Sequence, residues 1–198
     1  MARPNDMFGD LTGKVITITG GSRGLGKEMA FAFSRLGAHV VIASRKKENC
    51  EALAEEIMKE TGIEALPAEC HVGEWDQCDA LFEKVIDHFD KCDVLINNAG
   101  MSPLYNSLPE VSQELFDKVL NVNLRGPFRL SARFGEQMVK DGSGSIINVS
   151  SVAASQPSPH EAPYGAAKAG LHSLTQSFSR AYAPKVRVNC IMPGPFLT

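Results

Sequence analysis

Short runs of β-branched residues alternate along the chain with stretches that repeat apolar residues at helical spacing. The runs predict strands at Lys14 to Thr19, His39 to Ile42, about Glu64 to Ala68, Asp93 to Asn97, Ser145 to Val149 and Val186 to Met192. The helical spacing predicts helices from Leu25 to Leu36, Lys47 to Lys59, around Leu81 to Phe89, from Ser112 to Lys140, and from Tyr164 to Tyr182. This alternation indicates an α/β fold in a single domain over 1–198, with a doubly wound parallel sheet covered by helices on both faces.

Charge and composition narrow the class of protein. The 198 residues include 20 basic and 23 acidic side chains, neither of which forms a long run, so a nucleic-acid partner is not favoured. No stretch of about 18 apolar residues occurs, and the first residues lack an apolar signal segment, so we expect a cytoplasmic protein with no membrane partner. The five scattered cysteines are read as reduced thiols rather than disulfides, and they do not have the spacing of a metal site.

The stretch from Thr19 to Glu28, TGGSRGLGKE, fits two kinds of phosphate-binding loop. As a Walker A loop it lacks the Ser or Thr hydroxyl that ligates Mg²⁺, because position 28 is Glu. No predicted strand ends in the acidic residue that a nucleotide hydrolase uses as its second Mg²⁺ anchor. With Gly20, Gly24 and Gly26 it instead reads as a dinucleotide-binding turn at the start of a helix. A glycine-rich turn that binds nothing is the alternative.

Tyr164 and Lys168 stand four residues apart and therefore share one face of a predicted helix. They follow, in one order, the glycine-rich turn, Asn97-Asn98-Ala99-Gly100, Asn123 and the pair Ser150-Ser151, and they precede Pro193-Gly194. This set resembles the short-chain dehydrogenase/reductase family throughout the chain, and specifically a member similar to a 3-oxoacyl-carrier-protein reductase. The resemblance implies a Rossmann fold with strand order 3-2-1-4-5-6.

The resemblance also implies an enzyme that transfers hydride between NADP(H) and a small-molecule carbonyl or secondary alcohol. Its catalytic residues are Asn123, Ser151, Tyr164 and Lys168, with Ser151 chosen because it precedes Tyr164 by thirteen residues. Tyr164 exchanges the proton, Ser151 holds the substrate oxygen, and Lys168 lowers the pKa of Tyr164 and bonds the nicotinamide ribose. Asn123 helps to hold a water that connects Lys168 to solvent. A dinucleotide-binding regulator without turnover is the rival function.

The implied cofactor-binding residues are Gly20, Ser22, Arg23, Gly24, Leu25, Gly26, Ser44, Arg45, Asn97, Ala99, Gly100, Tyr164, Lys168, Pro193, Gly194 and Thr198. The second strand ends in Ser44-Arg45 instead of an acidic residue, which predicts NADP(H) over NAD(H). A solvated basic loop without this role is the alternative. Cys70-His71-Val72 occupies the region where the family often has an Asp near the adenine, and His71 is a candidate substitute.

Pro127 stands four residues after Asn123 and has no N–H to give to the Asn123 carbonyl. This predicts either a carbonyl left free for the relay water or a simple kink.

The family analogy places three segments around a pocket for a moderately apolar carbonyl compound: Met101 to Leu104, Val152 to His160 and Pro195 to Leu197. Oxoacyl thioesters, sugars and steroid-like ketones all stay open as substrates. The analogy also predicts a homotetramer or homodimer through the helices Ser112 to Lys140 and Tyr164 to Tyr182. Seven apolar residues motivate this interface, although core packing is the alternative for them: Phe116, Leu120, Phe128, Phe134, Leu171, Leu174 and Phe178.

Val186 to Met192 reads as a buried parallel strand, and six residues follow it. An uncovered apolar edge strand is an aggregation hazard. We therefore expect a longer protein of roughly 250 residues, from which a seventh strand and a substrate lid are missing here, with the lid disordered. A true truncation is the alternative.

Overall fold

The computed structural model describes residues 9–195, which form a six-stranded sheet in the order β3-β2-β1-β4-β5-β6. Every neighbouring pair is parallel. The strands are β1 (Val15–Thr19), β2 (His39–Ser44), β3 (Ala65–Glu69), β4 (Val94–Asn97), β5 (Gly144–Val149) and β6 (Val186–Ile191). The fold class and the strand order predicted from the sequence are confirmed. The order reverses between β1 and β4, where open parallel sheets form their ligand crevice.

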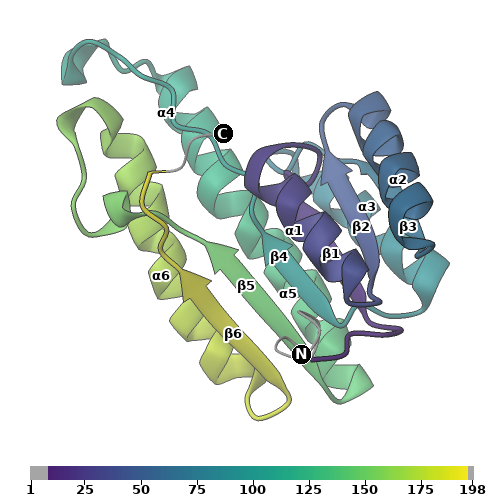
Figure 1. The fold of residues 1–198 in the computed structure, drawn as a ribbon. Helices are drawn as coiled ribbons and strands as arrows, with labels where there is room; N and C mark the ends of the chain where they lie inside the picture. The colour runs from purple at the N-terminus through teal and green to yellow at the C-terminus, as the bar shows by residue number, and fades with distance from the viewer. Residues whose placement is uncertain (1–8, 196–198) are drawn as a thin grey trace, which may run out of the picture.

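Helices cover both faces of this sheet (Figure 1). They are α1 (Gly24–Arg35), α2 (Lys47–Thr61), α3 (Trp75–Phe89), α4 (Gln113–Leu120), α5 (Gly126–Asp141) and α6 (Ala162–Tyr182). One apolar cluster joins α1 and α2 to one face of the sheet, and a second joins α3, α5 and α6 to the other. In β1, Ile16 and Ile18 enter the first cluster while Val15 enters the second, so the strand is buried on both faces.

The helix predicted from Ser112 to Lys140 is not regular. Between α4 and α5 the chain makes a π-helical turn, η3 (Asn121–Arg125), in which the Gly126 N–H bonds to the Asn121 carbonyl five residues back. Pro127 follows at once and cannot donate the hydrogen bond that a regular helix requires there. Gly126 also packs on another segment, because a Cβ at this position would lie 2.1 Å from the Val72 carbonyl oxygen. The turn carries Asn123 into the interior.

Strand β6 is buried on one face only, which corrects the expectation of a fully buried strand. Val186 and Val188 join the cluster under α5 and α6, whereas Arg187 and Asn189 point to the opposite, exposed side. The reason is that α5 and α6 pack on one face of β6, whereas α1 and α2, which cover the other face of the sheet, lie against β1, β2 and β3. The expected seventh strand and lid lie outside the described residues.

Membrane-spanning helices, metal-ligand clusters and disulfides are all absent from residues 9–195. No helix there is long and apolar enough to cross a membrane. No three His, Cys, Asp or Glu side chains there group as a metal site would require. All five cysteines are free thiols.

Candidate active site

The glycine-rich turn between β1 and α1 leaves no room for side chains at two of its positions. Gly20 has φ +63°, and a Cβ there would lie 2.9 Å from the Ala99 Cα. A Cβ on Gly26 would lie 2.2 Å from the Gly20 carbonyl oxygen. The backbone is therefore bare at the start of α1, where Arg23, the N-cap residue, provides no side-chain cap. Exposed backbone N–H groups at a helix start suit a pyrophosphate.

Thr19 and Asn98 fasten this turn to the end of β4. The Thr19 hydroxyl accepts hydrogen bonds from the N–H groups of Asn98 and Ala99, both at 3.0 Å. The Asn98 side-chain amide donates to the carbonyls of Thr19 at 2.9 Å and Gly20 at 3.2 Å. Neither residue was among the site residues predicted from the sequence. The alternation along β4 was the signal for Asn98, since it puts Asn97 and Asn98 on different sides of the chain.

Asn97 was predicted to bind the cofactor, but its side chain lies in the interior. Its amide donates to Ser131 Oγ at 3.0 Å and to Asn148 Oδ1 at 2.8 Å. Asn148 in turn donates to Thr175 Oγ1 at 2.9 Å. These bonds join β4 and β5 to α5 and α6, and the Asn97 Oδ1 is buried without a hydrogen-bond partner among the described residues.

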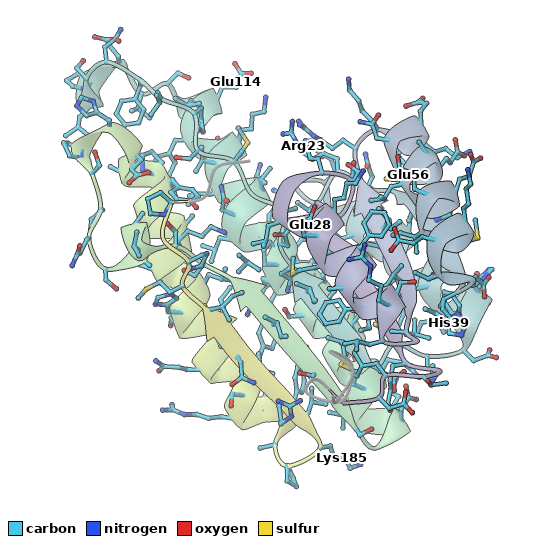
Figure 2. All side chains as sticks on the ribbon, in the orientation of Figure 1. Arg23, Glu28, His39, Glu56, Glu114 and Lys185 are labelled. Atoms are coloured by element: carbon cyan, nitrogen blue, oxygen red, sulfur yellow. The ribbon has the colours of Figure 1, made fainter. Side chains whose placement is uncertain are left out.

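At the end of β2, Ser22 from the glycine-rich turn donates a hydrogen bond to Ser44 at 2.9 Å. Arg23 and Arg45 are both exposed beside this pair. Figure 2 shows Arg23 projecting from the turn toward solvent. Two hydroxyls thus lie at this strand end, next in the chain to the exposed Arg23 and Arg45, while the exposed Glu69 is the register partner of Ser44 on β3. His71, by contrast, is held locally, because its Nδ1 accepts from the Gly73 N–H at 3.1 Å.

Ser151, Tyr164 and Lys168 meet between the end of β5 and the first two turns of α6. The Lys168 Nζ donates to the Val149 carbonyl at 2.7 Å and lies 5.6 Å from the centre of the Tyr164 ring. Lys168 is only 3% exposed, and this burial lowers its pKa to about 8. Burial raises the pKa of Tyr164, while a hydrogen bond with the Ser151 hydroxyl opposes that rise.

The expected lowering of the Tyr164 pKa is therefore wrong for this structure. Burial of the phenol is the largest influence on its pKa and acts in the opposite direction. The ammonium of Lys168 is held over the ring by the Val149 carbonyl. The sequence could not predict the depth of burial that decides between these effects.

Asn123 is fully buried and uses its side chain to hold the segment that follows β4. Its amide nitrogen donates to the carbonyls of Met101 at 2.8 Å and Val119 at 2.9 Å, and its Oδ1 accepts from the Met101 N–H at 3.2 Å. A Cβ on Gly100 would lie 3.0 Å from Asn123 Oδ1 and 3.6 Å from Lys168 Nζ. Gly100 thus marks a point that both side chains approach. The role of the Asn123 carbonyl toward a water stays a prediction.

The segment after β6 runs beside Ser151, because the Val152 N–H bonds to the Pro193 carbonyl at 3.2 Å. Apolar side chains are exposed on three segments at this edge, namely Leu104, Val152 and Met192. Pro193 and Gly194 accordingly lie at the predicted site, while Thr198 and the predicted pocket residues Phe196 and Leu197 are outside the described residues.

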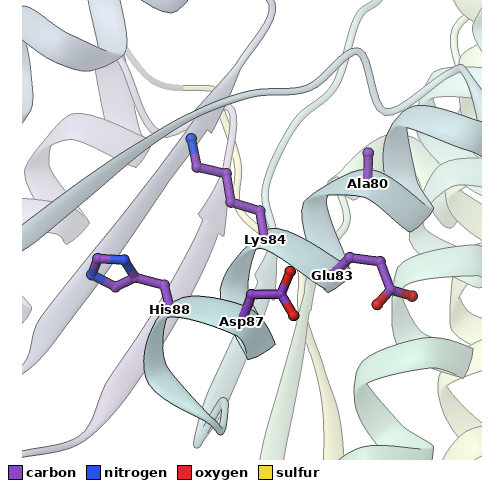
Figure 3. Close-up of a pocket in the computed structure, with 5 residues that line it drawn as sticks. All are labelled: Ala80, Glu83, Lys84, Asp87 and His88. Carbon is purple, nitrogen blue, oxygen red and sulfur yellow. The ribbon is translucent and has the colours of Figure 1, made fainter.

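A separate hollow of about 640 Å³ lies on the outer surface of α3 and is not the candidate site (Figure 3). It is lined by Ala80, Glu83, Lys84, Asp87 and His88. His88 bonds to Glu64, which directly precedes β3, so the hollow extends toward the edge of the sheet opposite to Tyr164. Lys84 is bonded to the Pro67 carbonyl at 2.8 Å. Glu83, Lys84 and His88 already have partners, and the bond to Glu64 places the hollow near the amino end of β3, whereas the glycine-rich turn follows the carboxyl end of β1.

Comparison with known proteins identifies the family. Residues 14–198 match the short chain dehydrogenase family, and the chain belongs to it. "Dehydrogenase/reductase SDR family member 4" of Pongo abelii is 35% identical over 185 residues, which are 93% of this chain and 66% of that protein. This chain therefore corresponds to only about two thirds of the length of that relative.

Two solved structures are similar in fold and sequence. A metagenomic short-chain oxidoreductase in complex with NADP has a TM-score of 0.87 and 35% identity, covering 93% of this chain and 84% of that one. An NAD⁺-bound xylitol dehydrogenase has a TM-score of 0.89 and 28% identity, covering 94% and 72%. Relatives of this fold thus bind either nicotinamide dinucleotide.

Proposed function

We propose that this chain is the catalytic part of an NADP(H)-dependent oxidoreductase that interconverts a carbonyl compound and a secondary alcohol. The observation that carries the proposal is the meeting of Ser151, Tyr164 and Lys168 beside Gly100, at the strand edge that also bears the glycine-rich turn. A buried lysine and a phenol with a hydroxyl partner are chemically suited to proton transfer.

The residues present fit a dinucleotide. The bare backbone around Gly20 and Gly26 leaves space that a Cβ would fill, and the start of α1 offers its N–H groups to the pyrophosphate. The bound nicotinamide would supply or accept the hydride. Ser151 would hold the substrate oxygen by a hydrogen bond, and Tyr164 would give its proton to that oxygen. With a pKa of about 8, Lys168 is mostly charged near neutral pH and would stabilise the phenolate that forms.

The preference for NADP(H) rests on Ser22, Ser44, Arg23 and Arg45 at the end of β2. Charge-assisted hydrogen bonds to a 2′-phosphate should favour NADPH over NADH by at least about tenfold in kcat/KM. Arg45→Asp should reverse the preference, because the new carboxylate would repel the phosphate and accept from a 2′-hydroxyl. Equal kcat/KM values for the two cofactors in the parent protein would disprove this part.

The substrate is proposed only as a class. Exposed Leu104, Val152 and Met192 at the mouth of the site favour a moderately apolar carbonyl compound. A 3-oxoacyl thioester remains one candidate of that kind, and a panel that also contains sugars and steroid-like ketones would separate them.

The deciding experiment follows NADPH oxidation with that panel for the parent and for Tyr164→Phe. We expect Tyr164→Phe to lose roughly 100-fold or more in kcat while it still binds NADPH. Tyr182→Phe is the control, because this phenol lies at the far end of α6. A parent that binds NADPH but reduces no carbonyl would favour the rival function of a dinucleotide-binding regulator.

We also propose a homodimer or homotetramer. Phe134, Leu171 and Phe178 belong to the core, so core packing accounts for these three of the seven residues that suggested an interface. Phe116 on α4 and Phe128 on α5 are 42% and 39% exposed and remain the candidates. Light scattering at micromolar concentration tests this, with a monomeric mass as the contrary result.

A cytoplasmic location, proposed from the free thiols, is testable by fractionation.

A further inference from the structure

Tyr105 lies in the segment that joins β4 to α4, and its hydroxyl bonds to backbone far along the chain. It donates to the Pro159 carbonyl at 2.8 Å and accepts from the Ala162 N–H at 2.7 Å. Ala162 is the first residue of α6. A single hydroxyl therefore ties the segment after β4 to the start of the helix that carries Tyr164 and Lys168.

The start of α6 needs such a partner. The first N–H groups of a helix have no acceptor within the helix. Glu161 at the N-cap gives no side-chain hydrogen bond, and Pro163 has no N–H. The Tyr105 oxygen thus acts as a cap that a distant segment supplies, two residues before Tyr164.

The other side of this first turn is also held. A Cβ on Gly165 would lie 2.8 Å from Pro157 Cβ and 3.0 Å from the Ala153 carbonyl oxygen. The helix therefore packs closely on the segment that begins at Ser151. Tyr164 sits between these two supports, so a shift of the first turn of α6 would change its distance from Ser151.

The segment after β4 is itself anchored at its start, where Asn123 bonds to both the N–H and the carbonyl of Met101. Tyr105 provides a second attachment four residues later. A segment fixed at two points holds the helix start more firmly than one free to swing.

We propose that Tyr105 is a positioning residue whose hydroxyl fixes the first turn of α6 and so holds Tyr164 against Ser151. The inference rests on the proposed function in one respect, namely that Tyr164 is the acid. It adds that the segment bordering the substrate site also sets the geometry of proton transfer.

The test compares Tyr105→Phe with Tyr182→Phe. Tyr105→Phe keeps the ring and removes both hydrogen bonds. Tyr182→Phe removes a phenol whose hydroxyl bonds to the Ala132 carbonyl, away from the reaction centre. Hydrogen exchange of the amides of Ala162, Tyr164 and Gly165 reports on the helix start without turnover. Steady-state kinetics with NADPH and an accepted carbonyl compound report on catalysis.

We expect Tyr105→Phe to exchange these amides at least about tenfold faster. Its kcat should fall about tenfold, while the KM for NADPH changes by less than about twofold. Tyr182→Phe should match the parent in all three measurements. A loss that raised only KM, or that appeared equally in Tyr182→Phe, would mean a general structural effect and would overturn the proposal.

The remaining outcomes are also decisive. Unchanged amide exchange in Tyr105→Phe overturns the proposal even if kcat falls, because the helix start would not depend on the hydroxyl. Faster exchange with unchanged kcat overturns the positioning role. If the parent turns over no carbonyl compound, the proposed function fails and Tyr105 loses any catalytic role, although the exchange data still show whether it caps α6.

Discussion

Burial of the charged Lys168 side chain should lower the free energy of unfolding, whereas burial of an apolar side chain at this position would not. In the folded chain its pKa is lowered to about 8 from the ordinary lysine value of 10.5, with desolvation as the largest cause. Below about pH 8 the folded state must keep a charge that the unfolded chain holds more easily. At 1.36 kcal/mol for each pH unit, the cost near neutral pH is on the order of 3 kcal/mol.

We therefore predict that Lys168→Met unfolds at higher urea concentration than the parent near pH 7. The loss of the hydrogen bond to the Val149 carbonyl offsets about 1 kcal/mol, so the net gain should be about 2 kcal/mol. The destabilisation of the parent decreases as pH rises from about 8 toward 10.5, because Lys168 then loses its proton in the folded and in the unfolded state. The difference in the free energy of unfolding between Lys168→Met and the parent should therefore shrink by about pH 10. Catalytic activity should be lost at the same time.

Lys185→Met is the matched control. Lys185 also donates to a backbone carbonyl, that of Val139 at 3.0 Å, but it is exposed just before β6, at the amino ends of the strands (Figure 2). This change should move the free energy of unfolding by no more than about 0.5 kcal/mol. The reasoning is refuted if Lys168→Met is no more stable than the parent near pH 7, or if its advantage does not depend on pH.

Three further substitutions probe the scaffold of the site. Gly26→Ala should abolish NADPH binding in a fluorescence titration and destabilise the fold by about 1–3 kcal/mol, because the new Cβ meets the Gly20 carbonyl oxygen; normal binding would contradict the tight turn. Asn98→Ala should raise the Kd for NADPH about tenfold by freeing the glycine-rich turn, and an unchanged Kd would show that the turn holds its shape without it. Asn148→Ala should lower the urea-derived stability by about 2–4 kcal/mol because Thr175 and the Asn97 amide lose their partner, whereas a loss below about 1 kcal/mol would argue against the network.

The sheet was predictable because strands buried on both faces have a distinctive composition. In β1, Ile16 and Ile18 alternate with the β-branched Thr17 and Thr19, all of them buried, and such β-branched runs are each followed by a helical repeat. The glycine-rich turn was also readable, since three glycines at the start of a helix have a specific steric use. These signals are local in sequence, so they can be interpreted without a structure.

The details that failed depend on contacts between distant segments. The π-helical turn at Asn121–Arg125 interrupts a stretch whose apolar spacing is still helical, and Gly126 packs there against Val72 from another segment. The exposure of β6 depends on which helices pack on it. Tyr105 has no local pattern at all, because both of its partners lie more than fifty residues away. Only the folded arrangement reveals these relations.

The two attachments of the segment after β4 delimit a short part of it that could change the substrate selectivity. Between Met101 and Tyr105 lies a short arch, Ser102 to Leu104, in which Leu104 is 82% exposed. Both attachments use backbone atoms or the single phenol, so the arch can exchange its side chains without disturbing either end. Directed evolution of a new substrate range should therefore begin with these three positions. A library there would alter what enters the site while the proton-transfer geometry and the dinucleotide turn stay fixed.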